Sequence, residues 1–332
     1  MMSDVDVLWK KAASLCDVGA FREAAECCER ALQEDPHDRR VRTLLGSCQW
    51  ETKQLGRGAA TFRELIDEGR NDSLPVLAFL HRMLGLCLSE MGQWKEAEDA
   101  FSRCVQLEPS ALSFFLLGAM QARLKPLSNE PVKLLRKAID LAPDDEEILC
   151  ELGRVLRLQH RYSEAIDVLR RAAELWPESP DVLRGLGAVL RLAGKCEAAE
   201  EALSKALKLN EDDARTHLEL ATLLAIQGVR GNEQAMHLRR ATELRPDLLQ
   251  VHSLLGGLCE DQGKSDEAAF HLCQAECLRR LHHGAVFQDA PASEPQDTDE
   301  DEEGGETRRV DRPGRAKIKG GEDEGAGEDK GA

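Results

Sequence analysis

Aromatic residues are scarce in this sequence of 332 residues: Phe, Trp and Tyr together make up 4% of it, and there is a single Tyr. Strands favour β-branched and aromatic side chains, so this scarcity argues against a β-sandwich core. Apolar residues nevertheless make up 42% of the chain, with many Leu and Ala. Both residue types favour helices. The composition therefore predicts an all-α protein.

Long hydrophobic segments are also missing. A membrane-spanning helix needs a run of about 18 or more apolar residues, and the chain has none. The longest candidate, VLAFLHRMLGLCL, is interrupted by His81 and Arg82. The first residues, MMSDVDVLWKK, lack the basic and then apolar pattern of a secretory signal. These features predict a cytoplasmic protein that does not associate with membranes.

Positive charge is outnumbered by negative charge. The chain has 44 Lys and Arg against 61 Asp and Glu, which gives a net charge of −17 at pH 7. Nonspecific binding to nucleic acid depends on Lys and Arg, so we expect no nucleic-acid partner. The eleven cysteines are odd in number and scattered, which fits a reducing compartment better than a disulfide framework. We interpret them as buried apolar thiols.

What the chain does contain is a repeat. The stretch LCELGRVLRLQHRYSEAIDVLRRAAELWP begins at Leu149, and its near copy LRGLGAVLRLAGKCEAAEEALSKALKLNE begins at Leu183, one step of 34 residues later. Both copies share leucines, a glycine and a late alanine in the same order. A repeat of this size indicates a stack of small structural units in which each unit contacts only its neighbours.

The repeat resembles the tetratricopeptide family, which has two helices per unit of 34 residues. The family pattern of Leu-Gly, an aromatic residue or Leu, then Ala and Pro is matched by Gly153, Leu169, Ala172 and Pro177. The resemblance implies a right-handed superhelix of antiparallel helix pairs, with the first helix of each pair lining a concave groove. The eight expected units are residues 5–38, 39–72, 74–110, 111–144, 145–178, 179–212, 213–247 and 248–283.

Some units depart from the pattern. The second unit has Leu65 at the late alanine and Arg70 at the proline. The fourth and seventh units each carry one extra residue, which we place in the turns LKPLSNEP and GVRGNE. Residues 284–332 are rich in Gly, Pro and blocks of like charge, and they have too few large apolar residues to offset the entropy lost on folding. We predict that this segment is a disordered, largely acidic tail.

A glycine recurs inside the first helix of six units, although Gly in a helix costs about 1 kcal/mol relative to Ala. We expect this cost to be offset by close approach of the second helix of the unit. The six positions are Gly46, Gly85, Gly118, Gly153, Gly187 and Gly256. Between units, Pro177 ends one helix, and Ser179 followed by Pro180 is expected to cap the next.

Candidate binding residues follow from the resemblance, because related proteins use set positions of the first helix to contact peptides. Those positions carry arginines in units three to six, with Phe115 as an apolar wall. The predicted groove residues are Arg82, Phe115, Arg123, Arg154, Arg157, Arg184 and Arg191. Guanidinium groups bind carboxylates in bidentate fashion. In the alternative interpretation, the arginines pair with acids such as Glu147, Glu151 and Asp181 and only keep the groove soluble.

Catalytic or cofactor-binding motifs are not convincing. GGLCEDQGKS has the wrong glycine spacing for a phosphate-binding loop and lies between expected helices. Cys273 and Cys277 are one helical turn apart, with His271, His282 and His283 nearby, which is a weak zinc pattern. We favour the interpretation that both thiols pack beside small residues of the last helix. We therefore predict no cofactor and no metal.

The sequence as a whole predicts a non-catalytic scaffold or adaptor that binds an acidic peptide or helix of another protein in its groove. The acidic tail could occupy the same groove. Two alternatives remain. The protein could assemble end to end through its last unit, whose outer face is either exposed or covered by Val286 and Phe287, or it could be an accessory subunit of an enzyme complex with a metal site in that unit.

Overall fold

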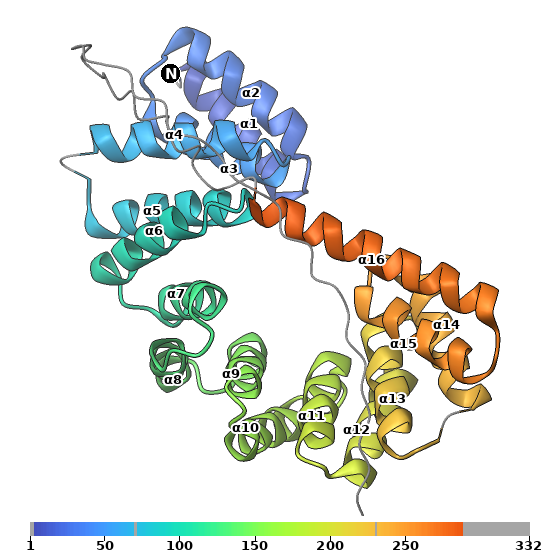
Figure 1. The fold of residues 1–332 in the computed structure, drawn as a ribbon. Helices are drawn as coiled ribbons and strands as arrows, with labels where there is room; N and C mark the ends of the chain where they lie inside the picture. The colour runs from blue at the N-terminus through green and yellow to red at the C-terminus, as the bar shows by residue number, and fades with distance from the viewer. Residues whose placement is uncertain (1–2, 70–71, 230, 288–332) are drawn as a thin grey trace, which may run out of the picture. The chain divides into compact units, whose positions relative to one another are not determined.

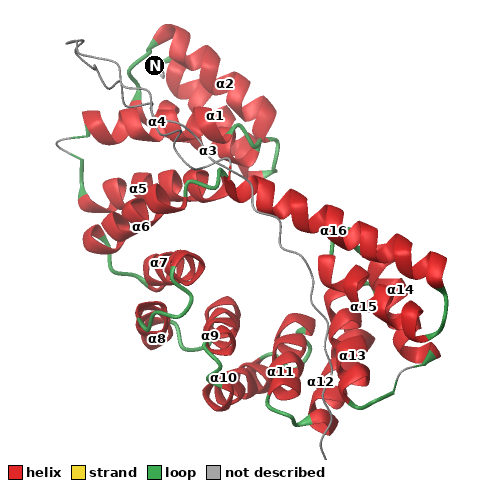
Figure 2. Cartoon of the chain, in the orientation of Figure 1, coloured by secondary structure: helices red, strands yellow, loops and turns green. Residues whose placement is uncertain are grey.

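The computed structural model describes residues 3–69, 72–229 and 231–287, which form α-helices joined by short loops and contain no strand (Figures 1 and 2). The helices are α1 (Asp4–Asp17), α2 (Phe21–Glu34), α3 (Arg39–Glu51), α4 (Leu55–Glu68), α5 (Leu74–Glu90), α6 (Trp94–Leu107), α7 (Ala111–Leu124), α8 (Glu130–Leu141), α9 (Glu146–Leu158), α10 (Tyr162–Leu175), α11 (Pro180–Leu192), α12 (Cys196–Leu209), α13 (Ala214–Ile226), α14 (Asn232–Leu244), α15 (Leu249–Asp261) and α16 (Ser265–Phe287). The all-α prediction is confirmed.

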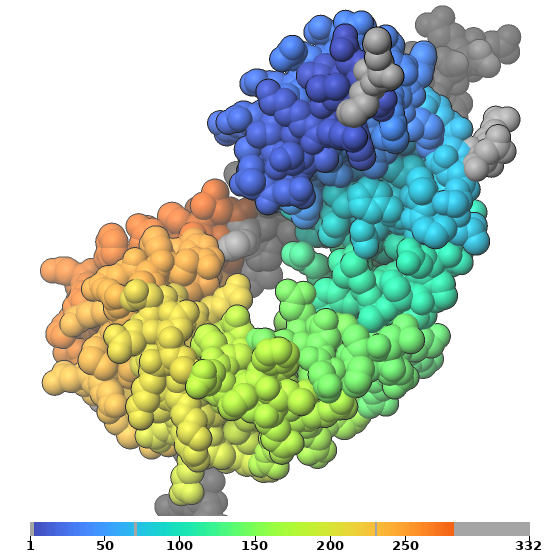
Figure 3. Space-filling model, turned by 180° about the vertical axis from the view of Figure 1, so that it is seen from behind, coloured from blue at the N-terminus to red at the C-terminus, as the bar shows by residue number. Residues whose placement is uncertain are grey.

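The helices follow one another as pairs within one compact unit, Met1–Gly284. Each odd-numbered helix packs against the even-numbered helix after it, and each pair packs against its neighbours in the chain. The space-filling view shows this order as a continuous run of colours, with each pair against the next (Figure 3). Each residue range expected for a repeat unit holds one such pair, so we number the pairs as units one to eight. This is the arrangement of a helical solenoid.

The recurring glycines bring the two helices of a unit together, as the sequence predicted. A Cβ atom added to Gly153 would lie 2.6 Å from Cγ of Leu169, and one added to Gly187 would lie 2.5 Å from Cγ of Leu203. No real side chain tolerates such distances, so these positions need glycine. The same contact joins the other four glycines to Phe62, Phe101, Leu135 and Leu272.

The unit boundaries also form as the sequence predicted. The hydroxyl of Ser179 accepts a hydrogen bond from the backbone N–H of Val182, with Pro180 at the start of α11. Upstream, α10 ends at Leu175, two residues before Pro177. The extra residues of units four and seven lie in turns, because residues 125–129 and 227–231 connect their helices, whereas residues 159–161 and 193–195 suffice in units five and six. The helix faces therefore stay in register.

The last helix corrects one boundary. We expected disorder from residue 284, but α16 continues to Phe287. Gly284 is the only helix-weakening residue in this stretch, and a single glycine does not stop a helix that is already formed. Residues 288–332, the side chains of Val286 and Phe287, and Arg70 lie outside what the structure describes. Among the described helices, none has the length and apolar character needed to cross a membrane.

The interpretation of the cysteines was partly wrong. Six of the eleven thiols are buried, three are half-buried, and Cys273 and Cys277 are exposed. The two exposed cysteines lie on α16, whose outer face has no following unit to cover it within the described residues. The expectation that both pack beside small residues therefore fails because it assumed a neighbour that only internal units have.

Candidate functional site

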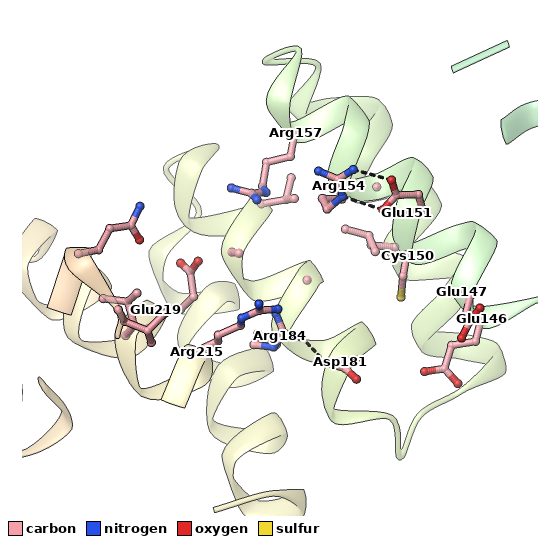
Figure 4. A pocket seen from close by; sticks show the side chains of 18 of the residues that line it. Glu146, Glu147, Cys150, Glu151, Arg154, Arg157, Asp181, Arg184, Arg215 and Glu219 are labelled. Carbon is pink, nitrogen blue, oxygen red and sulfur yellow. Dashed lines mark hydrogen bonds and ion pairs between the residues drawn. The ribbon is translucent and has the colours of Figure 1, made fainter. Parts of the chain in front are cut away.

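The odd-numbered helices of the middle units enclose a cavity of about 630 Å³, which we call the central cavity. Its lining comes mainly from α9, α11 and α13, with Phe115 of α7 at one end and Leu248 and Gln250 at the other. Figure 4 shows the charged side chains of these helices around the shared space. First helices therefore line the site, as the resemblance implied. Four predicted residues lie in it, namely Phe115, Arg154, Arg157 and Arg184.

Three of the predicted arginines are held by acids of the chain itself. Arg154 donates from Nε to Glu151 Oε2 over 2.6 Å, on the same helix. Arg184 pairs with Asp181 and, across the unit boundary, with Asp213, with 3.0 Å between Nε and Oδ2. Arg191 lies outside the cavity lining, and its Nη2 atom is 2.8 Å from Oε2 of Glu219 in the next unit. These three guanidinium groups therefore pair with acids of the chain, as one part of the alternative interpretation expected, although Glu147 is not one of their partners.

The ion pair between Arg184 and Asp213 affects the pKa of Asp213. Burial raises the pKa of this carboxyl. Hydrogen bonds from Thr216 and the backbone, together with the charge of Arg184, lower the pKa by more than burial raises it. The net shift is downward, so Asp213 is ionised in the folded protein. A carboxylate that caps α13 and also holds Arg184 ties unit six to unit seven.

Arg157 differs from these three. It lines the central cavity and is half-buried, and its side chain makes no ion pair or hydrogen bond with the described residues. Arg215 of α13 also lines the cavity, and its side chain has no acidic partner among the described residues. Sequence reasoning missed Arg215 because it is the third residue of its unit, which is not a contact position in the family scheme. A search for arginines that recur at one position of the repeat would not have found it either, because the equivalent residue of unit six is Asp181.

The remaining two arginines lie elsewhere. Arg123 is exposed and stacks on Trp94, with its Cζ atom 4.4 Å from the ring centre. It lines a second cavity of about 430 Å³, together with Phe115 and Arg154. Arg82 lies over Phe79 at 5.2 Å and lines neither cavity. The predicted residues therefore do not form a single site, because Arg82 and Arg191 line neither cavity.

The charge of the central cavity is mixed. Its lining contains the acids Glu146, Glu147, Glu151, Asp181 and Glu219 beside the arginines Arg154, Arg157, Arg184 and Arg215. The expected stripe of arginines is thus interleaved with acids of α9, α11 and α13. The sequence interpretation named Glu147, Glu151 and Asp181 among these acids but not Glu146 or Glu219.

Units seven and eight contain a second polar feature that the sequence analysis missed, a buried pair of histidines in each. His217 Nδ1 lies 2.9 Å from His237 Nδ1, and His252 Nδ1 lies 3.1 Å from His271 Nδ1. The Nε2 atoms of His217 and His252 are each 3.0 Å from a backbone carbonyl. One signal in the sequence could have revealed these pairs, because the two histidines of unit seven recur one repeat later in unit eight.

The contacts of each histidine pair constrain where its hydrogens lie. Because a carbonyl only accepts, Nε2 of His217 and of His252 carries a hydrogen. In the neutral form of a pair, Nδ1 of this ring accepts a hydrogen bond from the Nδ1–H of the second histidine. Burial first, and then the neighbouring ring, lower the pKa of His237 and of His271. Each pair is a closed hydrogen-bonded unit.

The metal alternative gains no support from the last unit. His271 is engaged by His252, Cys273 and Cys277 point outwards, and the side chains of His282 and His283 lie outside what the structure describes. In the described ranges, no group of three or more His, Cys, Asp or Glu side chains is suited to a metal ion.

Comparison with known proteins places these features in a family. Tetratricopeptide repeat models match residues 16–80, 78–111 and 144–212. A curated relative, tetratricopeptide repeat protein 16 of Macaca fascicularis, is 23% identical over 111 residues, which is 32% of this chain and 12% of the relative. The chain therefore matches only a small part of that protein.

Solved structures agree on the fold. A tetratricopeptide repeat protein from Parabacteroides merdae superposes with a TM-score of 0.62 at 14% identity, over 76% of this chain and 97% of that one. The APC/C hetero-tetramer Cut9–Hcn1 gives 0.60 at 19% identity, over 74% and 48%. PilF of Pseudomonas aeruginosa gives 0.51 at 24% identity, over 65% and 99%. At these identities the likeness concerns the fold alone.

Proposed function

The chain belongs to the tetratricopeptide repeat family, and on this premise we propose that it is a non-catalytic scaffold whose central cavity binds a carboxylate-bearing segment of another protein. Solenoids of stacked helix pairs present long surfaces suited to extended partners. A cavity lined by first helices from five consecutive units offers such a surface here. The odd number and scatter of the cysteines favour a cytoplasmic location.

Arg157 carries this proposal. Its guanidinium group faces the central cavity without an acidic partner, whereas Arg154, Arg184 and Arg191 are neutralised by acids of the chain. A free arginine at a half-buried site binds a carboxylate with charge-assisted hydrogen bonds in a fixed geometry. Arg215 supplies a second free guanidinium group at the same cavity. The acids of the chain hold the paired arginines in place, and the two free arginines attract the carboxylates of the partner.

A peptide selection tests the proposal with random sequences in place of a natural partner. A displayed library of random peptides is selected on the full chain, and the dissociation constants of the selected peptides are measured by fluorescence polarisation. We expect clustered Asp and Glu among the binders. Replacing Arg157→Glu and Arg215→Glu together should weaken their binding by about tenfold or more, because attraction becomes repulsion.

Arg30→Glu together with Arg170→Glu provides the matched control. Both arginines are exposed, on α2 and α10, outside the lining of the central cavity, and replacing the two changes the net charge by the same amount as in the cavity variant. Circular dichroism confirms that each variant keeps its helix content. Binders without acidic residues, or equal losses in the control and in the cavity variant, would refute the carboxylate proposal.

Self-association through the last unit is a second candidate function. Phe270 and Leu281 on α16 expose 57% and 71% of their surface, and Cys273 and Cys277 lie exposed on the same helix. Analytical ultracentrifugation measures whether the sedimentation coefficient rises with concentration. Phe270→Lys together with Leu281→Lys should abolish such a rise, and a concentration-independent wild-type value would exclude this function.

A further inference from the structure

Two cysteines from different units are in contact at the first unit boundary. Sγ of Cys16, in the last turn of α1, lies 3.4 Å from Sγ of Cys48 on α3. Both belong to the first helices of their units, and α1 packs beside α3. The simplest interpretation is that the two thiols only pack between the units. Their separation, however, is that of a weak S–H···S hydrogen bond, so the two sulfur atoms already face each other.

We propose that Cys16 and Cys48 are a site of oxidative modification, at which hydrogen peroxide converts the two thiols into a disulfide that links unit one to unit two. A disulfide requires sulfur atoms about 2.05 Å apart, so the two atoms must approach by roughly 1.4 Å. Cys16 is the penultimate residue of α1 and is followed by the turn at Gly19. A helix end accommodates such a shift more easily than a helix centre.

The surroundings determine which thiol reacts first. Cys16 is half-buried, whereas Cys48 is 1% exposed. Burial, and then the contact with Cys16, raise the pKa of the Cys48 thiol well above its usual range. Burial and the neighbouring Cys16 and Cys27 raise the pKa of Cys28 to about 12. Because the thiolate is the reactive form, peroxide should attack Cys16 before its neighbours.

The reaction balances in two steps. The Cys16 sulfur attacks one oxygen of hydrogen peroxide, the O–O bond breaks, and the departing hydroxide takes the thiol proton to form water. The product is a sulfenic acid at Cys16. The Cys48 sulfur then attacks the Cys16 sulfur, the S–O bond breaks, and the second hydroxide leaves as water with the Cys48 proton. Two thiols are oxidised and one peroxide is reduced.

The test uses the full chain with Cys273→Ser and Cys277→Ser, which removes the two exposed thiols. The chain is treated with hydrogen peroxide, blocked with N-ethylmaleimide, digested and analysed by mass spectrometry. We expect a peptide joining Cys16 to Cys48 that lacks two hydrogen masses and separates on reduction. Its yield should be at least about tenfold higher in the folded chain than in the guanidinium-unfolded chain, because the fold holds the sulfurs together.

Two further measurements complete the test. Cys87 and Cys104 are an internal control, because both are buried and neither makes a sulfur contact within the described residues. They should stay reduced. In Cys48→Ser, the sulfenic acid of Cys16 has no partner, so dimedone should label Cys16. Dimedone is added only after the peroxide has been removed, when the Cys16 sulfenic acid of the wild-type chain should already have reacted with Cys48. Labelling of Cys16 in that chain, a bond between Cys16 and Cys28, or no reaction at either thiol would overturn the proposal.

Discussion

Units five and six differ from units seven and eight at one pair of core positions. In unit five the pair is Leu149 and Val168, and one repeat later it is Leu183 and Ala202. In unit seven the same two positions hold His217 and His237, and in unit eight they hold His252 and His271. Burial is similar, since Leu149 and Leu183 expose 1% and 6% while His217 and His252 expose 7% and 4%.

The difference shows what a core position of this fold requires. Leu149 and Leu183 are stabilised by removal of apolar surface from water, which makes no demand on direction. A buried imidazole must instead satisfy its polar atoms. The histidine pairs do so with one ring-to-ring hydrogen bond and one bond to a carbonyl. The backbone arrangement of the unit thus accepts either chemistry, provided that both members of the pair change together.

The largest effect is expected at the glycine where the two helices of a unit meet, which units five, six and eight contain and which is Ala221 in unit seven. Gly187→Val in unit six places side-chain atoms where Leu203 lies, and we expect a loss of about 3 kcal/mol of stability through overpacking. Gly185→Ala is the control, because its new Cβ would meet Leu169 at an ordinary 3.5 Å. Urea denaturation measures both variants. Equal stability of the two would contradict the close-approach explanation.

Exchange of the core pair tests the comparison directly. His217→Leu alone leaves His237 Nδ1 without its acceptor, which should cost about 1–3 kcal/mol. Adding His237→Ala copies the pair of unit six and should recover part of this loss, because no buried donor remains unpaired. A double-mutant cycle from urea denaturation measures the coupling. If the double variant lost, relative to wild type, the sum of the losses of His217→Leu alone and His237→Ala alone, the histidines would be acting independently.

The two regions should also differ in their response to pH. Burial and the neighbouring ring lower the pKa of His237 and His271, while Glu233 opposes the shift at the first and Glu267 at the second. A folded-state pKa below the unfolded value means that the unfolded chain binds more protons. Stability is therefore fully present above pH of about 6.5 and is lost as the pH falls below it.

Hydrogen exchange read by mass spectrometry at pH 7.5 and pH 5.5, corrected for intrinsic exchange rates, measures this difference by unit. Protection of α13–α16 should fall, while that of α9–α12 should stay the same. The His217→Leu, His237→Ala double variant should remove the effect from unit seven and leave it in unit eight. A uniform loss along the chain would instead point to general acid destabilisation.

The smallest effect concerns the turns of units five and six. His160 has a φ of 58°, whereas Gly194 occupies the equivalent turn of unit six at 75°. This left-handed conformation is strained for residues with a side chain. His160→Gly should stabilise unit five by about 0.5 kcal/mol, despite the lost contact with Tyr162, and Gly194→His should destabilise unit six by about 1 kcal/mol. Thermal denaturation measures both, and equal signs would contradict the strain explanation.

Several features of the fold could be predicted because they depend on neighbours in the sequence. The cap at Ser179, the helix end before Pro177 and the glycine contact of Gly153 with Leu169 each act within one unit or its boundary. Arg154 and Arg157, which the family scheme placed on one face of their helix, both line the central cavity. In each case the spacing of residues along a helix determines which groups meet.

The features that escaped prediction involve partners from different units or the absence of a neighbour. Arg184 and Arg191 are neutralised by Asp213 and Glu219 of the following units. The free guanidinium group of Arg215 lies at a position that the family scheme does not use. Exposure of Cys273 on the last helix follows from the end of the stack, which a rule derived from internal units does not describe.

By itself, the sequence determined a stack of helix pairs, because small residues and turn residues at a fixed interval act locally and identically in every unit. Only the tertiary structure decided which arginines remain free, which histidines share a proton and which thiols touch. These outcomes depend on distances between side chains of different helices, and the direction of each side chain is settled only when the helices pack against one another.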